Sequence, residues 1–447
     1  MNPSAYINEN RKAFEEMLSD LVQIPTVSAD PERRNDINRA AKLASEFLKN
    51  HGATANIYQT AGNPVVVGKF AAPNARQTLT IYNHLDVQPA DEPEWRREPF
   101  VFVKEGNKYF GRGSTDDKGP ALTALLAARY AIESGIPLNI QFIWELEEEI
   151  GSPHFGEFLK AHRDELKCDS VLVIDSIWIS SSKPTICYGI RGNIIGSMLL
   201  ETAELAVHSG ITGGVARNPI AELSEVVAKC HDAKTGKVLI PGFYDGVRKV
   251  SAAEKRNFER CGFNLKNFAR DYHLKKIKVK EAADALTRMW CKPTFEVHGF
   301  VGGYTGPGIK TAIPPRAELK FSCRLVTDQD PEKIAQRIEK YVARINPDVE
   351  VVVNAKLHPY VGEFTGEYAN AAYRAMKSGF GGNPVFVRSG GSDGAIISLH
   401  QQFNAPVVMI GLSLPEHGYH APNEYFDWHQ TSHGIQTLIE YFNLIAM

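Results

Sequence analysis

Residues 79–86 read Leu-Thr-Ile-Tyr-Asn-His-Leu-Asp, and this stretch decides the fold because an apolar, strand-like run ends there in polar groups. Similar apolar runs occur at Val65–Phe70, Ile140–Trp144 and Val171–Ile174. Between them, residues 119–132 are rich in alanine and leucine and predict a buried helix. Strands that alternate with helices predict an α/β fold, with a mixed, mostly parallel sheet flanked by helices.

Polar side chains follow these runs at the positions where each predicted strand ends. His84, Glu149 and Asp175 each lie just after such a run. In parallel α/β sheets the working groups collect at the carboxyl ends of the strands. The sequence therefore predicts that these three residues meet at one edge of the sheet.

The pattern of the chain changes after Tyr188. Residues 194–200, 219–230, 295–300, 317–325, 331–345 and 349–353 predict, in turn, a strand, helix, strand, strand, helix and strand. This β-α-β-β-α-β order predicts a ferredoxin-like α+β domain. We therefore expect a discontinuous catalytic domain, residues 1–188 and 356–447, with a second domain inserted at residues 189–355. The inserted domain has a basic, helical insert of its own at about residues 234–293.

Composition argues against several classes of protein. The net charge of the 447 residues is −2, so neither nucleic acid nor an anionic membrane is expected as the main partner. No apolar run approaches the roughly 20 residues that span a bilayer, and residues 1–15 lack the apolar core of a secretory signal. The six cysteines are scattered, which argues against a disulfide framework and a thiolate zinc site. These features predict a cytoplasmic protein.

Five short clusters of acidic residues and histidines carry the chemistry of the sequence. They are His84-Leu85-Asp86, Asp116-Asp117-Lys118-Gly119, Glu147-Glu148-Glu149, Asp175 and residues 417–420, which contain two histidines. Taken alone, each cluster has an ordinary explanation: a structural strand-end histidine, a helix cap or a solvated charge run. Together they supply imidazoles and carboxylates to one rim of the sheet. Such ligands suit zinc, with manganese or cobalt as alternatives, and two metal ions would share a bridging carboxylate.

Three strings in these clusters resemble a known family. They are Asn83–Pro89, Gly111–Pro120 and the Glu-Glu-Ile-Gly-Ser string at residues 148–152. The strings resemble the dizinc metallopeptidase family that includes glutamate carboxypeptidase, aminoacylase, acetylornithine deacetylase, succinyl-diaminopimelate desuccinylase and carnosinase. The first two strings look most like the carnosinase and cytosolic nonspecific dipeptidase branch. The resemblance covers almost the whole chain, and it implies that the inserted domain acts as a lid and in dimerisation.

The resemblance implies a role for most residues of the clusters. The implied ligands of two divalent metal ions are His84, Asp116, Glu149, Asp175 and His420. Asp116 would bridge the two ions. His84 and Asp175 would complete the first site, and Glu149 and His420 would complete the second. Asp86 would orient His84, and Glu148 would be the general base. A cis peptide bond is implied after Asp116, whereas His417 has no implied role.

Other residues resemble functional groups of that family outside the clusters. His208 is implied to reach the active site of the neighbouring subunit and to stabilise the oxyanion there. Arg324 is implied to bind the carboxylate of the substrate. A substrate-binding loop is implied at Arg388, Ser389, Gly390, Gly391 and Ser392. Asp393 follows this loop where some relatives carry an apolar residue, and this departure bears on specificity.

The resemblance implies hydrolysis of the amide bond of dipeptides or short peptides. A hydroxide held between two metal ions would attack the carbonyl carbon, with Glu148 as the general base. An N-acyl-amino-acid deacylase, such as a desuccinylase or deacetylase, would use the same ligands on another substrate. A catalytically inactive binding protein on this fold would have lost ligands or base, and the chain has kept them all. The expected partners are a small peptide or N-acyl amino acid and a second copy of the chain in a homodimer.

Overall fold

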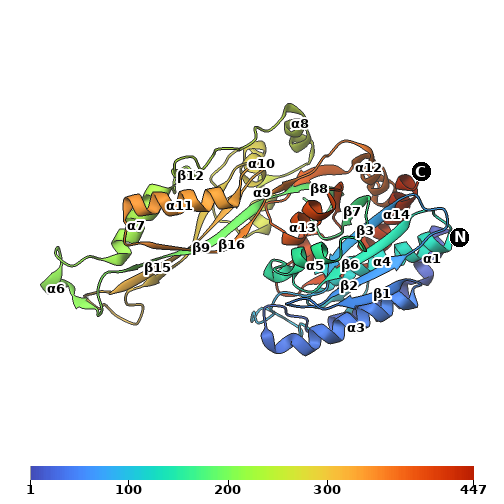
Figure 1. Ribbon diagram of the computed structural model, residues 1–447, viewed down its shortest axis with the longest axis horizontal. Coiled ribbons are helices and arrows are strands. Elements are labelled where there is room, and N and C mark those ends of the chain that lie inside the picture. The colour runs from blue at the N-terminus through green and yellow to red at the C-terminus, as the bar shows by residue number, and fades with distance from the viewer. Residues whose placement is uncertain (1) are drawn as a thin grey trace.

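The computed structural model describes residues 2–447, and the larger of its two bodies is built on a nine-stranded sheet (Figure 1). In spatial order the strands are β1 (Thr54–Tyr58), β2 (Val65–Phe70), β6 (Asn139–Glu145), β3 (Thr78–His84), β7 (Ser170–Val173), β19 (Val407–Ile410), β8 (Thr185–Ile190) and β17 (Tyr360–Val361), with β18 (Val385–Arg388) beside β8. Strands β6, β3, β7 and β19 run parallel, and antiparallel strands flank them on both sides. The predicted mixed α/β sheet is confirmed, with its parallel strands at the centre.

Helices cover both faces of this sheet. One face carries α1 (Pro3–Glu9), α2 (Arg11–Val22), α3 (Arg34–Asn50), α4 (Gly119–Glu133), α12 (Glu367–Phe380) and α14 (Trp428–Ile445), and the other carries α5 (Phe155–Ala161) and α13 (Gly394–Phe403). Side chains alternate between the two faces along each strand. Leu79 and Ile81 of β3 therefore enter the first apolar core, and Tyr82 enters the second.

The alanine- and leucine-rich helix α4 lies between the sheet and helices α2 and α14. All side chains of residues 121–128 are fully buried, because small residues let neighbouring elements approach from every side. The helix begins at Gly119, where a Cβ atom would lie 2.3 Å from the carbonyl oxygen of Ser114, so the entry into α4 requires glycine. The preceding Lys118 donates to the carbonyl oxygens of Leu21 and Ile24 at 3.0 and 3.1 Å, which fixes this entry against α2.

The smaller body contains a four-stranded antiparallel sheet. Its strands, in spatial order, are β13 (Thr294–Gly302), β15 (Arg316–Leu325), β9 (Gly192–Glu201) and β16 (Glu350–Leu357). Helices α7 (Pro219–Cys230) and α11 (Pro331–Ile345) pack on it and share a core with Ile194 and Phe321. The chain order β9-α7-β13-β15-α11-β16 is the predicted β-α-β-β-α-β order. The chain passes between the two bodies at Arg191, which joins β8 to β9, and at residues 358–359.

Within the 234–293 segment, Val238, Ile240 and Phe243 still belong to the core of the smaller body, whereas residues 250–291 pack against the larger one. Their helices are α8 (Ala252–Arg260), α9 (Leu265–Asp271) and α10 (Ala282–Cys291), and β12 (Lys237–Val238) precedes them. Phe258 of α8 and Trp290 of α10 belong to the second apolar core of the large sheet, together with Val385 and Val387 of β18. This segment therefore links the two bodies on the side of β18.

Short elements complete the described chain. They are the three-stranded sheet of β4 (Val103–Glu105), β5 (Lys108–Phe110) and β20 (Tyr425–Asp427), the pairs of β10 (Val207–His208) with β14 (Ala312–Ile313) and of β11 (His231–Asp232) with β12, and α6 (Ser209–Thr212). Figure 1 shows α6 at the end of the molecule that lies farthest from the large sheet. Within residues 2–447, no helix combines the length and the apolar character needed to span a bilayer.

Candidate metal centre

The acidic and histidine clusters meet at the carboxyl ends of the parallel strands. His84 is the last residue of β3, and Glu148 and Glu149 follow β6 in a short turn. Asp175 lies two residues beyond β7, which pairs in parallel with β3. His420 reaches the same place from the loop before β20. The sequence-based expectation of a meeting at the strand ends is therefore confirmed.

Asp116 lies in the middle of this group and contacts both histidines. Its Oδ1 atom is 2.9 Å from Nε2 of His84, and its Oδ2 atom is 2.9 Å from Nε2 of His420. Oδ2 of Asp175 lies 3.6 Å from Nε2 of His84, and Oε2 of Glu149 lies 3.1 Å from Nε2 of His420. The five side chains form two triads that share Asp116, and the ligand atoms of each triad lie within 4.8 Å of one another.

The donor atoms of the two triads fit divalent metal ions. Each triad offers one imidazole nitrogen and two carboxylates, a ligand set that suits zinc and that manganese or cobalt also accept. Burial lowers the pKa of His420, but its hydrogen bonds to Asp116 and Glu149 outweigh burial and raise the pKa to about 10. The carboxylates thus attract positive charge to this centre, and one divalent ion in each triad would neutralise them.

The two adjacent acids at the start of α4 face different partners. The peptide bond between Asp116 and Asp117 is cis, as the resemblance implied. Oδ2 of Asp117 accepts hydrogen bonds from Nδ2 of Asn83 at 2.7 Å and from the backbone N–H of His84 at 3.4 Å. Asp117 therefore binds the end of β3 through hydrogen bonds. Asp116 is the acid of this pair that contacts both histidines.

Asp86 holds both His84 and the glutamate turn. Nδ1 of His84 lies 3.0 Å from the backbone oxygen of Asp86 and 3.5 Å from its carboxylate, so Nδ1 is held by Asp86, and Nε2, which faces Asp116, is the nitrogen that would bind a metal. The Asp86 carboxylate accepts the backbone N–H groups of Glu148 and Glu149 at 3.1 and 3.0 Å. Asp86 was predicted to orient His84, and it does so mainly through its backbone oxygen. Its carboxylate instead fixes the turn that carries Glu148.

Glu148 belongs to a third group of acids, with Asp175 and Asp393, whose ligand-type atoms also lie within 4.8 Å of one another. Burial raises the pKa of Glu148 well above its ordinary value, and the charge of Asp393 raises it further. A carboxylate with a raised pKa accepts a proton more readily, which suits a general base. Asp393 also caps α13 through the N–H groups of residues 395 and 396.

Glu424 organises the centre, and no pattern in the sequence had predicted a role for it. One carboxylate oxygen accepts from Arg112 Nη1 and from the N–H of Gly113, both at 2.9 Å. The other oxygen accepts from the N–H groups of Thr115 and Asp116, at 2.9 and 3.1 Å. Burial raises the pKa of Glu424 to about 7, while Arg112 and the backbone N–H groups oppose that rise. All four partners are donors, and the ionised carboxylate is the form that accepts from all of them.

The sequence did not predict a role for three more residues, two of which contact the ligands and one the substrate loop. The Tyr419 hydroxyl donates to Oδ1 of Asp175, and Nε2 of Gln88 donates to Oε2 of Glu149 at 2.7 Å. The third is Arg191, described with the loop below. Tyr419 and Gln88 lie in the same short strings as His420 and His84, and this proximity in sequence is what could have predicted their role.

The implied substrate loop spans residues 388–392, and its last four residues lie between two arginines. Nη1 of Arg324 donates to Oγ of Ser392 at 2.7 Å. Nε of Arg191 donates to the carbonyl oxygen of Gly390 at 2.8 Å, and the backbone N–H of Arg191 donates to that of Gly391 at 2.8 Å. Burial, together with the charge of Arg324, lowers the pKa of Arg191 to about 10. Two guanidinium groups thus flank the loop.

The other implied substrate contacts are arranged differently. Ser389 donates its backbone N–H to the carbonyl oxygen of Gly189 at 2.7 Å, and its Oγ accepts from the N–H of Gly391 at 3.0 Å. Arg388 is buried and pairs with Glu254 of α8, so its guanidinium is engaged within the protein. His208 is exposed on β10 and caps α6, the helix that Figure 1 shows at the far end of the smaller body, and it does not join the triads of its own chain.

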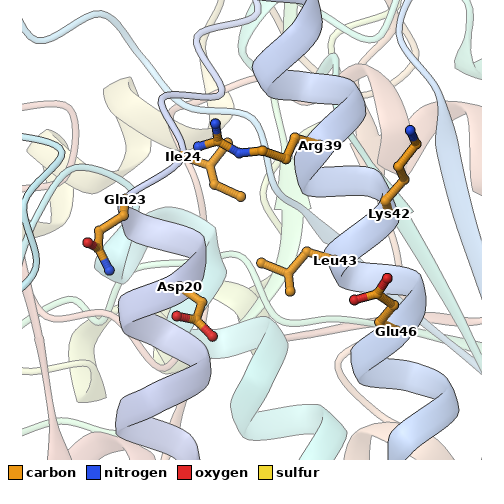
Figure 2. Close-up of a pocket in the computed structure, with 7 residues that line it drawn as sticks. All are labelled: Asp20, Gln23, Ile24, Arg39, Lys42, Leu43 and Glu46. Carbon is orange, nitrogen blue, oxygen red and sulfur yellow. The ribbon is translucent and has the colours of Figure 1, made fainter.

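A separate hollow of about 500 Å³ lies between α2 and α3. Figure 2 shows side chains of both charges around it, and its lining residues are Asp20, Gln23, Ile24, Arg39, Lys42, Leu43 and Glu46. None of them belongs to the two triads or to the substrate loop. This hollow is therefore separate from the candidate metal centre.

Comparisons with known proteins agree with this arrangement. Residues 80–443 match the family model described as Peptidase family M20/M25/M40. The chain belongs to this family. The human Beta-Ala-His dipeptidase is 30% identical, over 94% of this chain and 87% of its own length. A Cys-Gly metallodipeptidase of Saccharomyces cerevisiae is 29% identical, over 97% of this chain and 96% of its own length. The resemblance seen in the sequence is therefore confirmed.

Solved structures of M20 proteins match almost the whole chain. Human carnosine dipeptidase 1 has a TM-score of 0.86 at 27% identity, and the match covers 99% of this chain and 98% of that one. The M20 family metallo-carboxypeptidase Sso-CP2 from Sulfolobus solfataricus has a TM-score of 0.90 at 28% identity, over 96% of this chain and 98% of that one. This M20 chain is accordingly a metallopeptidase by family and by fold.

Proposed function

We propose that this M20 protein is a dipeptidase that uses two divalent cations, with zinc as the first choice and manganese or cobalt as alternatives. The observation that carries the proposal is the pair of ligand triads that share Asp116, with Glu148 beside them. The dipeptidases among its relatives support a small peptide as the substrate. The proposed ligands are His84, Asp116, Glu149, Asp175 and His420.

The proposed mechanism assigns a separate task to each group. Two divalent cations, when bound, supply an activated water and polarise the scissile carbonyl. Glu148 accepts the proton of the attacking water and returns it to the leaving amine. Asp86 keeps the turn of Glu148 and the imidazole of His84 in place. Arg324 and Arg191 bind the carboxylate of the peptide, because guanidinium groups form strong charge-assisted hydrogen bonds to carboxylates.

We assign residues 1–188 and 356–447 to the catalytic domain, and residues 189–355 to a lid and dimerisation domain. Exposed apolar side chains near His208 support a dimer, since Leu205, Ile211 and Ile309 are 76%, 82% and 94% exposed. In such a dimer, His208 of one subunit would stabilise the oxyanion in the other. A cytoplasmic location is supported by the six cysteines, which are all free.

Hybrid dimers test the role of His208 across subunits. A Glu148→Gln subunit lacks the base, and a His208→Ala subunit lacks the oxyanion group, so each homodimer should be nearly inactive. The purified hybrid dimer should recover about half of the wild-type activity, because one of its two sites is then intact. Activity is measured after co-expression with two different affinity tags. A purified hybrid with no more activity than the parents contradicts the shared site.

A substrate panel tests the proposed function itself. The purified protein, supplied separately with zinc and manganese, is assayed on dipeptides and on N-acetyl and N-succinyl amino acids. We expect kcat/KM on the best dipeptide to exceed that on every N-acyl amino acid by at least about tenfold, which is 1.4 kcal/mol in transition-state binding. The reverse preference would assign the protein as an N-acyl-amino-acid deacylase. Absence of hydrolysis across the panel with both metals would contradict an amidohydrolase.

A further inference from the structure

The helices of the 234–293 segment support the strand that leads into the substrate loop. Helix α8 contacts β18, and α10 contacts α8. Phe258 of α8 and Trp290 of α10 stack edge to face, with ring centroids 4.9 Å apart, in the core that also contains Val387 of β18. The side-chain amide of Asn257 donates to the carbonyl oxygen of Phe386. The backbone of β18 is thus held from α8 by apolar and polar contacts.

A buried ion pair marks the point where β18 ends. Nη2 of Arg388 contacts Oε1 of Glu254, and the two side chains are only 7% and 8% exposed. The Tyr188 hydroxyl lies 3.1 Å from the same Glu254 oxygen and 3.3 Å from Nε of Arg388. The second oxygen of Glu254 accepts the backbone N–H of Ser251 at 3.0 Å, within the cap of α8. Both carboxylate oxygens therefore have fixed partners.

The loop that follows is fixed at one end by this pair and at the other by the flanking arginines. Arg388 is the last residue of β18, and residues 389–392 follow it directly. The loop then meets Arg191 at Gly390 and Arg324 at Ser392, both within hydrogen-bonding distance. A shift of Arg388 would move the loop relative to both guanidinium groups. Glu254 lies on α8, 134 positions before Arg388 in the chain, and has no contact with the triads.

We infer that α8 and α10 position the substrate-binding loop, and that Glu254 and Arg388 are positioning residues for substrate binding and not for the chemical step. The inference rests on the proposed dipeptidase function and gives the 234–293 segment a task in it. A buried pair that loses one charge leaves the other without compensation, so the pair should rearrange and the loop should become mobile. The triads and Glu148 come from other segments of the chain, and Asp393, which neighbours Glu148, is held separately by its cap on α13, so the chemical step should be unaffected.

Glu254→Gln is the test variant, and Glu259→Gln is its matched control, because Glu259 lies on the same helix and is exposed. Glu254→Gln should raise KM for the best dipeptide about tenfold while kcat changes less than about twofold and metal content stays at the wild-type value. Hydrogen exchange in peptides covering residues 386–396 should accelerate, with no change in residues 121–128. Glu259→Gln should alter none of these quantities.

A lower melting temperature with unchanged KM and unchanged exchange in residues 386–396 would overturn the inference, because it would show a structural role alone. If Glu254→Gln does not fold, Tyr188→Phe takes its place, since it removes one hydroxyl from the pair and keeps the ring. The same rise in KM, of smaller size, is then expected, and an unchanged KM overturns the inference. A wild-type protein that hydrolyses no dipeptide would refute the proposed function, while the exchange measurement would still decide whether α8 holds the loop.

Discussion

Glu148→Gln should lower kcat on a dipeptide by about 10²- to 10⁴-fold, the usual contribution of a general base, and leave the metal content unchanged. The amide has nearly the shape of the carboxylate but does not accept a proton from water. The turn should persist, because the Asp86 carboxylate holds the backbone N–H groups of residues 148 and 149 and not their side chains. The loss should therefore appear in kcat, with KM little changed.

The measurement is steady-state kinetics together with metal analysis of the same preparation. Glu157→Gln is the matched control, because Glu157 is an exposed glutamate on the neighbouring helix α5, and this variant should keep wild-type kinetics. A Glu148→Gln enzyme that keeps more than about a tenth of wild-type kcat would remove Glu148 from the role of base. A variant that has lost its metal would instead show that Glu148 is a ligand.

Much of the fold was predictable because its signals are local. The apolar run at Val65–Phe70 is β2 with the predicted bounds, and helix α11 occupies the predicted residues 331–345. The strand order of the large sheet was not predictable in the same way. Strand β19 runs between β7 and β8, more than 200 positions after both, and such pairing depends on contacts that no local period encodes.

Some residues of the candidate site were likewise predictable from local sequence, and others were not. His84, Glu149 and Asp175 follow their strands directly, so their meeting was predictable from strand ends. The choice of Asp116 over Asp117 came from a resemblance to known proteins, and the structure gives the physical difference: Asp116 contacts two histidines, whereas Asp117 contacts Asn83.

Long-range polar partners were not predictable. Glu424 holds the segment of Asp116 through backbone N–H groups about 310 positions earlier, and a sequence pattern does not reveal bonds to the backbone. The same limit applies to Arg388. Its string suggested a substrate contact, but its guanidinium is paired with Glu254, whose position in space became visible only with α8 placed against β18.

Removal of the metals should have the second large effect, a loss of essentially all turnover that is reversed by added metal. The two triads share Asp116, so neither is complete without it. Wild-type protein stripped by a chelator should regain activity as zinc or manganese is added. Asp116→Asn should bind less metal than wild type at both positions and recover little activity, because the amide lacks the charge that balances two cations.

The most direct test of the central claim is a titration of stripped wild-type protein with zinc, with dipeptide hydrolysis followed at each step and bound metal counted in parallel. The account predicts that activity reaches its plateau at two bound metal ions per chain, and that Asp116→Asn fails to reach it. Full activity of the stripped protein, or a plateau at two ions that Asp116→Asn reproduces, would contradict a centre built on two triads that share Asp116.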